Sequence, residues 1–505
     1  MTWRYVPVAI HLEHSSQHAL SGVFLLNTST GQHYVLTVTD LAHPDRYSFK
    51  FVSPWCIGPS TITWLPLTLS DSRRLTEGPS GTPRILRDFI EGLQRDGHFK
   101  FKPNSSQQLT VLHLRIPETC KTNLAISFTN PDNLLPITFK RASDTPIPSK
   151  VALHCCPFSL TSVAIFINHK VYGSAALNLG NAGFLTDVKY LDDVIGGVVF
   201  LDSSPSESIG IMCGAVTKMN GDGELSIVAS WDAIFSLLNY KDLTFPAQIE
   251  NVTTSQVLTL DPSRSVVRIS VIATDGRFWG SGVCIAPNLI VTNKHVLKSF
   301  DSLKDLHIRL PGKPNLSLHL KDVTIHESPM QGFDLCFIRL KNPCIDLQPV
   351  KVCSLYTEEE PSPRIGEPVK SIGHGLFFAQ ENVQPLTSEG RINNVIYKDL
   401  EGFGQETKSM IIASAGCWNG SSGGGLFNQN NELVGIMTSN GKLSCGEVMP
   451  NFTLAIPINI IEKSRFMLEN NLPSVDLKQK VGDLWSLRET HNSVLDSNTP
   501  TVHKL

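Results

Sequence analysis

Short apolar runs, in which hydrophobic and polar positions often alternate, recur along the chain and predict a β-rich fold. Ser265–Val271 reads SVVRISV, an alternation typical of a strand with one buried face. Phe333–Leu340 (FDLCFIRL) and Glu432–Asn440 (ELVGIMTSN) are further strand-like runs. Long segments with a helical period are few, although a short helix is expected from Ile460 to Leu472. The pattern therefore predicts an all-β dominated protein.

Composition adds limits on size and on the kind of partner. A chain of 505 residues predicts about three units, at roughly 100–200 residues per domain. Hydrophobic residues make up 41% and charged residues 18%, which suits globular units with sizeable cores. The formal net charge of −3 argues against nucleic acid as a partner. No apolar run reaches the ~18 residues of a membrane span, so none is expected.

The cysteines and the first residues bear on the compartment. Met1–Leu20 lacks the apolar run and cleavage site of a secretory signal peptide, so we expect no secretion. The 11 cysteines show no C-x-x-C pair, which favours reduced thiols over a disulfide framework.

The stretch Gly416–Phe427, GCWNGSSGGGLF, places two serines before three glycines. Alone, it could be a glycine-rich turn. A G-x-S-G-G pattern has a glycine two positions before and after a nucleophilic serine, and only Ser422 satisfies it. For Ser421, Asn419 would replace the first glycine. The backbone N–H groups of Gly420 and Ser422 would then form an oxyanion hole.

A serine needs a base, and a histidine and an aspartate occur in strand-edge contexts upstream. His295 follows two apolar strands in TNKHV, and Asp334 opens the strand of FDLCFIRL. The order His295, Asp334, Ser422, with spacings of 334 − 295 = 39 and 422 − 334 = 88, is that of chymotrypsin-type proteases. By that template His295 is the general base, and Asp334 fixes its tautomer.

The first half of the chain repeats this pattern without its chemistry. Ser21–Leu41 matches Ser281–Leu297, and three later segments match in the same order. The triad positions hold Asp40, Thr110 and Ile195, so this copy cannot carry out acyl transfer. We expect it either to position substrate or gate the other copy, or to act as a structural brace.

The sequence predicts two tandem chymotrypsin-like double β-barrel domains, the first degenerate. The expected divisions are a degenerate domain at 1–238, a linker at 239–264, a protease domain at 265–470 and a C-terminal tail at 471–505, whose polar end, Arg488–Leu505, is expected to be mobile.

With these residues in hand, the chain resembles the HtrA/Deg branch of trypsin-like serine proteases. TNKHV and NGSSGGGLF carry the resemblance, although the 505 − 470 = 35 residues after Asn470 are too few for the usual PDZ domain. The final His503-Lys504-Leu505 is similar to the peroxisomal address Ser-Lys-Leu but departs at its first position. Together these features are similar to the family of peroxisomal leader peptide-processing proteases.

The resemblance implies a serine endopeptidase of the peroxisomal matrix. It would remove N-terminal leaders from imported proteins, process β-oxidation enzymes, and meet an import receptor through its C-terminus. Its substrate groove would include Thr438, Ser439 and Asn440. Gly416, at the base of the specificity pocket by likeness to trypsin, would select an uncharged side chain. The family also cleaves itself, which here would fall near Cys56 or Cys120.

Other features remain open or absent in the sequence. Cys417 and Cys445 flank the expected pocket, either paired or as free thiols. No zinc-type spacing or phosphate-binding loop occurs, so no metal and no cofactor is expected. His154 and His374 are interpreted as packing or loop residues. A homo-oligomer is neither required nor excluded. The alternatives are a quality-control protease outside peroxisomes, with an accidental terminal tripeptide, and a peptide-binding adaptor that does not cut.

Overall fold

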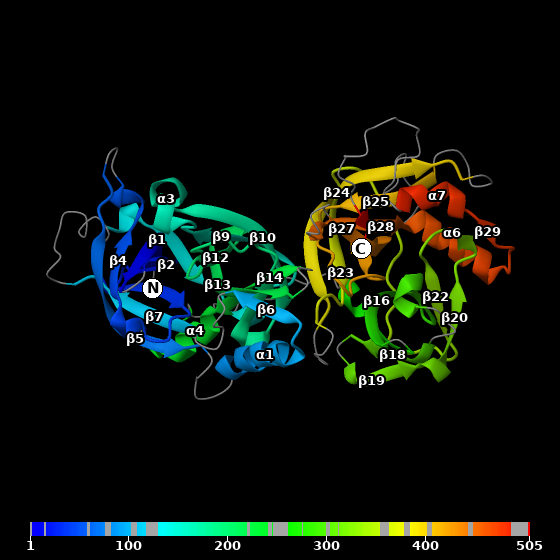
Figure 1. Ribbon diagram of the computed structural model, residues 1–505, viewed down its shortest axis with the longest axis horizontal. Coiled ribbons are helices and arrows are strands. Elements are labelled where there is room, and N and C mark those ends of the chain that lie inside the picture. Colours follow the sequence, from blue (N-terminus) through cyan, green and yellow to red (C-terminus); the bar gives the residue numbers. More distant parts are fainter. Residues whose placement is uncertain are drawn as a thin grey trace. The chain divides into compact units, whose positions relative to one another are not determined.

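The computed structural model shows a chain of two β-rich units (Figure 1). It describes residues 3–14, 17–57, 61–75, 82–102, 109–117, 130–219, 223–240, 245, 261–274, 276–298, 303–311, 313–353, 363–377, 384–400, 407–442, 448–485 and 503–504. The first unit comprises Met1–Met219 and Glu224–Val252, and the second Asn220–Gly223 and Thr253–Leu505. The division after Val252 falls within the segment expected as a linker, most of which lies outside the described residues.

The first unit contains two six-stranded barrels. The first barrel follows the order β1-β2-β3-β7-β5-β4 and is closed by pairing of β1 with β4. Its strands are β1 (Trp3–Glu13), β2 (Gln17–Asn27), β3 (His33–Thr39), β4 (Ser48–Val52), β5 (Leu65–Arg74) and β7 (Thr110–Arg115). The second barrel follows β12-β9-β10-β11-β14-β13 and is closed by pairing of β12 with β13. Its strands are β9 (Ser149–Cys155), β10 (His169–Asn178), β11 (Gly183–Thr186), β12 (Val198–Leu201), β13 (Ser204–Lys218) and β14 (Glu224–Ser230).

The described residues of the first unit also form the following strands and α-helices. They are β6 (Phe99–Lys102), β8 (Leu135–Phe139), α1 (Thr82–Asp96), α3 (Ser159–Phe166) and α4 (Trp231–Leu238). Helix α4 begins where the Ser230 side chain accepts a hydrogen bond from Ala233 N, a typical N-cap. It ends at Asn239, whose left-handed backbone stops the helix.

The second unit has the same plan. Its first sheet runs β19-β18-β15-β16-β17-β22-β20, and its second runs β26-β23-β24-β25-β28-β27-β30, with β26 also paired to β27. The first sheet consists of β15 (Val266–Ala273), β16 (Gly276–Ala286), β17 (Leu289–Thr292), β18 (Leu303–Leu310), β19 (Lys313–His319), β20 (Val323–Glu327) and β22 (Cys336–Leu340). The second consists of β23 (Pro368–Gly373), β24 (Leu386–Lys398), β25 (Thr407–Ala413), β26 (Gly425–Phe427), β27 (Leu433–Lys442), β28 (Val448–Pro457) and β30 (His503–Lys504).

The remaining elements of the second unit are short strands and helices. They are β21 (Met330–Gln331), β29 (Val475–Asp476), α5 (Lys294–Leu297), α6 (Ile458–Glu469) and α7 (Lys478–Trp485). Among the described residues, no helix has the length and hydrophobicity needed to span a bilayer.

Alternating strand residues explain where the cores lie. In β18, Leu306, Ile308 and Leu310 are buried, whereas Asp305 and the other intervening residues are partly exposed. Completely buried aromatic side chains fill the cores, each contributing about 1.5–3 kcal/mol through burial. The prediction of tandem double-barrel domains is thereby confirmed.

The C-terminal tail was expected to begin at residue 471, and the structure corrects this boundary. Leu477, Val481 and Trp485 are buried in the core of the second unit, on and just before α7. Strand β29 also pairs in parallel with β21. Most other residues from 471 to 485 are polar, so the three buried residues Leu477, Val481 and Trp485 do not form a hydrophobic pattern that is recognisable in the sequence.

Candidate functional site

Asp334 holds His295 by two hydrogen bonds. His295 Nδ1 lies 2.5 Å from Asp334 Oδ2, and His295 N donates to Asp334 Oδ1 at 3.0 Å. Helix α5 carries His295, and Asp334 stands just before β22, whose Cys336 pairs with Thr292 at the end of β17. Because a carboxylate only accepts, Nδ1 carries the proton and Nε2 remains available as a base.

Ser422 and Ser421 have different surroundings, although they are adjacent. Ser421 is 1% exposed, and its Oγ accepts a hydrogen bond from Trp418 N at 3.3 Å within the turn. Ser422 is partly exposed, lines a pocket together with His295, and donates to Thr438 O at 3.0 Å. The structure thus brings Ser422, rather than Ser421, to the pocket.

The backbone around Ser422 requires glycine. Gly420 has φ = +93° and Gly423 has φ = +84°. A Cβ on Gly420 would lie 2.1 Å from Trp279 Nε1, and one on Gly423 would lie 2.0 Å from Ser281 O. Among the described residues, Gly420 N and Ser422 N have no hydrogen-bond partner, so both amides are available to an anion.

A residue that the sequence analysis overlooked, Ser281 on β16, anchors this loop. Its Oγ donates to Gly420 O at 2.9 Å and accepts from His374 N at 2.8 Å. Its N donates to Ser422 O at 2.8 Å, and its O accepts from Thr292 Oγ1 at 2.7 Å. Ser281 is fully buried, so these bonds are shielded from water.

Asn293 is a second overlooked residue. Its Nδ2 donates to Asp334 O at 2.8 Å and to Thr438 Oγ1 at 3.2 Å, and the residue is fully buried. One side chain therefore joins the segments of the histidine, of the aspartate and of β27. Only its position two residues before His295 in TNKHV could have indicated such a role.

The pocket at Ser422 has a volume of about 240 Å³. Its lining includes the three residues expected from sequence, Thr438, Ser439 and Asn440. Asn440 Nδ2 donates to Cys417 O at 2.9 Å, whereas the buried Ser439 Oγ has no partner among the described atoms.

Gly416 does not line this pocket, which corrects its expected place at the base. A Cβ there would lie 2.6 Å from Trp418 Cη2, so the indole packs directly over Gly416. Its N donates to Ser388 Oγ, and its O accepts from Ser371 Oγ. Cys417 and Trp418 line the pocket in its place.

The described cysteines near the site are poorly suited to act as a nucleophile in place of Ser422. Cys417 is buried, and Cys445 lies outside the described residues, as does Cys120. Burial raises the pKa of Cys284 and Cys336, both near the site in sequence, to about 12. Cys56, considered for self-cleavage, is also buried.

The first unit reproduces the scaffold of this site bond by bond. Ser21 N donates to Ile195 O at 2.8 Å, as Ser281 N does to Ser422 O. Thr37 Oγ1 donates to Ser21 O at 2.6 Å, matching the bond from Thr292 to Ser281.

The turn and the strand register complete the correspondence. Gly196 has φ = +87°, and a Cβ there would lie 2.0 Å from Ser21 O, as at Gly423. Thr37 pairs with Leu112 as Thr292 pairs with Cys336, which places Thr110 at the position of Asp334. The internal repeat expected from sequence is therefore present in three dimensions.

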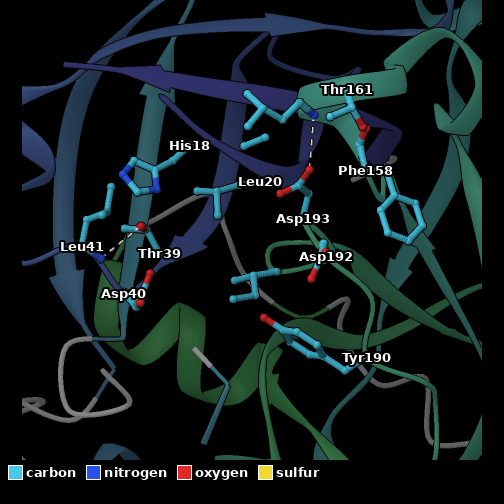
Figure 2. Close-up of a pocket in the computed structure, with 13 residues that line it drawn as sticks. His18, Leu20, Thr39, Asp40, Leu41, Phe158, Thr161, Tyr190, Asp192 and Asp193 are labelled. Atoms are coloured by element: carbon cyan, nitrogen blue, oxygen red, sulfur yellow. Dashed lines mark hydrogen bonds between the residues drawn. The ribbon is translucent and has the colours of Figure 1, made fainter. Parts of the chain in front are cut away.

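The degenerate triad position opens onto a pocket of about 380 Å³, larger than the one at Ser422 (Figure 2). Asp40 lies on one side, while Asp192 and Asp193 lie on the other, beside Tyr190. Asp193 stands where the second unit has Gly420, since Ser21 Oγ donates to Asp193 O as Ser281 Oγ does to Gly420 O. Burial raises the pKa of both Asp40 and Asp193. The position that is glycine in the second unit thus carries a carboxylate in the first.

The C-terminal tripeptide is partly described. His503 and Lys504 form β30, which pairs antiparallel with Lys442 and Gly441 of β27. The tail was expected to present these residues freely, so this pairing is a correction. Leu505 lies outside the described residues.

His154 and His374 are packing residues, as expected. His154 Nδ1 lies 2.9 Å from the Tyr5 hydroxyl, and burial lowers its pKa to about 4. His374 Nε2 faces Val266 O at 3.4 Å, and burial likewise lowers its pKa to about 4. Both imidazoles are neutral at neutral pH.

Comparisons with known proteins agree with this architecture. The family described as trypsin-like peptidase domain matches residues 280–436, which include all three triad positions. A mouse peroxisomal leader peptide-processing protease is 25% identical over 359 residues, covering 68% of this chain and 57% of that protein. The human protein of that name is 27% identical, covering 44% of this chain and 34% of that protein.

A crystal structure of the serine endoprotease from Yersinia pestis matches 42% of this chain and 64% of that one, at 21% identity and a TM-score of 0.31. The chain spans little more than half of the mouse relative and about a third of the human one. Residues 280–436 thus match the family described as trypsin-like peptidase domain, and the chain is similar over 68% of its length to a mouse peroxisomal leader peptide-processing protease.

Proposed function

We propose that the chain is a serine endopeptidase in which Ser422 is the nucleophile, His295 the general base and Asp334 the group that orients it. The observation that carries the proposal is the double hydrogen bond from His295 to the Asp334 carboxylate, in the pocket that Ser422 also lines. Such an arrangement places the carboxylate on Nδ1 and keeps Nε2 as the nitrogen that can accept the proton of Ser422.

The reaction begins when the Ser422 hydroxyl leaves Thr438 O and donates to His295 Nε2. His295 takes the proton as Oγ attacks the scissile carbonyl, and it returns the proton to the leaving amine. Water then attacks the acyl-enzyme by the same route and releases the acid. Apo enzymes commonly tighten these contacts only when substrate binds.

The oxyanion of each tetrahedral intermediate would be held by Gly420 N and Ser422 N. Both amides lack partners among the described residues, and the positive φ of Gly420 sets the turn between them. Removing one such donor typically costs about 10²–10³ in rate.

Substrate would bind as an extended peptide along the end of β27. Ser439 Oγ, buried and without a partner among the described atoms, is a ready hydrogen-bonding group for it. The pocket has no carboxylate among its lining residues, and Cys417 and Trp418 limit its size. These features favour a small uncharged side chain before the cut.

We propose N-terminal leaders of proteins imported into peroxisomes, and β-oxidation enzymes, as the substrates. The similarity to two relatives named peroxisomal leader peptide-processing protease supports this choice, and the final His503-Lys504-Leu505 supports a peroxisomal location. The proposed receptor would have to displace β30 from β27 to read the tripeptide.

Labelling with a fluorophosphonate tests the catalytic assignment. We expect the purified protein to be modified, Ser422→Ala to lose the modification, and Ser421→Ala to keep it. Ser421 is the matched control because it is adjacent but buried in the turn. Retention of the label in Ser422→Ala would place the reactive serine elsewhere.

Two cellular measurements test the location and the substrates separately. Deleting the last three residues should move a tagged protein from peroxisomes to the cytosol. Cells that carry only Ser422→Ala should accumulate leader-bearing precursors. Peroxisomal import that persists without the tripeptide would reject its role as an address, without affecting the protease assignment.

A second function, peptide binding by the first unit, is favoured by its pocket. The cavity is larger than the one at Ser422, and the carboxylates of Asp40, Asp192 and Asp193 line it. A cationic side chain of a peptide would match this charge. The matched test uses protein whose Ser422 is already blocked by fluorophosphonate. An arginine-containing peptide should bind it more tightly than the norleucine analogue, and Asp193→Asn should remove the difference.

A further inference from the structure

Three side chains that bind metal ions well lie together on the β18–β19 hairpin of the second unit. Asp305 and His307 are two residues apart on β18, so their side chains share one face of the sheet. His319 on β19 is the cross-strand partner of His307 in the antiparallel register. The sequence separates His307 from His319 by twelve positions, which fits no known zinc spacing and therefore gave no signal.

The geometry of the group is compact. His307 Nε2 lies 2.9 Å from Asp305 Oδ2, and the two imidazole centroids are 4.6 Å apart with planes inclined by 72°. One ligand atom from each residue lies within 4.8 Å of the others. Ligands of a tetrahedral zinc ion, with bonds of about 2.0–2.2 Å, are roughly 3.3 Å apart, so small side-chain rotations would bring all three to an ion.

The surroundings permit an ion to reach the group. All three residues are partly exposed, with 33% and 41% of the His307 and Asp305 side chains accessible. The other face of β18 packs into the core, which fixes the backbone beneath the ligands. Ser317 Oγ lies 3.1 Å from His319 Nε2, and this contact would be exchanged for the metal bond. Arg309, two residues after His307, is the cation on the same face that opposes binding.

We propose that Asp305, His307 and His319 form a binding site for a divalent transition-metal ion, most suitably Zn²⁺. Each histidine would supply one ring nitrogen, Asp305 one carboxylate oxygen, and water the fourth position. Two imidazoles select Zn²⁺, Ni²⁺, Co²⁺ or Cu²⁺ over Mg²⁺ and Ca²⁺, which prefer oxygen ligands. The ion would join β18 to β19 and brace the sheet whose strand β17 ends three residues before His295.

Titration calorimetry with Zn²⁺ tests the site on the full chain, in a Ser422→Ala background that prevents self-cleavage. We compare His307→Ala and His319→Gln with His326→Ala. His326 is a matched control because it is a strand histidine of the same unit that also contacts a hydroxyl, Thr324 Oγ1, at 3.2 Å. The two ligand variants change only partly exposed side chains, and circular dichroism would verify their folding.

We expect one Zn²⁺ site in the parent protein that is weakened at least about tenfold, or 1.4 kcal/mol, in both ligand variants and is kept in His326→Ala. With Co²⁺, the same site should give visible bands of a tetrahedral ion without the thiolate charge-transfer band of a cysteine site. Slower amide exchange in β18 and β19 on adding Zn²⁺ would support the brace. Equal binding by the parent and both ligand variants, or a thiolate band, would overturn the proposal.

Discussion

Replacing Ser281 by alanine removes a single oxygen atom and two hydrogen bonds from beneath the proposed oxyanion hole. The Gly420 carbonyl loses its donor, and the His374 amide loses its acceptor. The backbone bond from Ser281 N to Ser422 O remains. The perturbation is therefore confined to one side of the loop that carries the nucleophile.

The magnitude follows from the two groups left behind, the buried Gly420 carbonyl and the partly buried His374 amide. Ser281 is fully buried, and each buried polar group that loses its partner costs about 1–3 kcal/mol. We expect the second unit to lose roughly 2–5 kcal/mol of its free energy of unfolding. Gly420 has a positive φ, and its peptide would no longer be anchored in the orientation that directs Gly420 N to the pocket. Labelling should slow by at least about tenfold, with the loss of one oxyanion donor, about 10²–10³, as the upper limit.

The first unit provides the matched control, because Ser21→Ala removes the equivalent bonds. Ser21 Oγ donates to Asp193 O at 2.7 Å and accepts from Cys156 N at 2.8 Å. We would measure the second-order rate constant of fluorophosphonate labelling, and thermal unfolding by calorimetry. Ser21→Ala should destabilise the first unit by a similar amount and leave the labelling rate unchanged. Labelling of Ser281→Ala at the wild-type rate would refute the anchoring argument. Equally slow labelling of both variants would mean that general destabilisation, and not the loss of the anchor, lowers the rate.

Three further outcomes are expected. Asn293→Ala should slow labelling about tenfold, because Asp334 and Thr438 lose a shared donor worth about 1 kcal/mol per bond; the same rate constant measures it. Asp334→Asn should lower peptide hydrolysis by about 10⁴, the effect in the protease template, since an amide can stabilise the wrong tautomer of His295; a rate near wild type in peptide assays would contradict this. Burial lowers the pKa of His154 from 6.5 to about 4, so between these pH values the unfolded chain binds a proton that the folded chain does not. The free energy of unfolding of the first unit should therefore fall by up to about 3 kcal/mol from pH 6.5 to pH 4. Denaturant titrations should show that His154→Phe reduces this dependence on pH.

The sequence identified the candidate triad because each member stands in a local pattern. The choice of Ser422 over Ser421 needed only the positions of the flanking glycines, and the left-handed backbone at Gly420 and Gly423 supplies the physical reason. The double-barrel fold was predictable because the strand runs and the internal repeat are also local sequence patterns.

Features that depend on register between distant strands were not predicted. Ser281 contacts Gly420, 139 positions away, through its hydroxyl, and nothing in its GSG context indicates this partner. The pairing of His307 with His319 depends on an irregularity in the register between Arg309 and Leu310. Gly416 was misplaced because the pocket depends on the direction of the Trp418 ring, which the sequence does not contain.

The scaffold shared by Ser281 in one unit and Ser21 in the other has a consequence for engineering. The first unit keeps these hydrogen bonds although it lacks a triad. They therefore connect the strand to the turn independently of the triad side chains. The first unit is then a suitable scaffold for introducing a catalytic triad by substitution. The substitutions Asp40→His, Thr110→Asp, Ile195→Ser and Asp193→Gly would install the missing side chains on a backbone that already has the required turn.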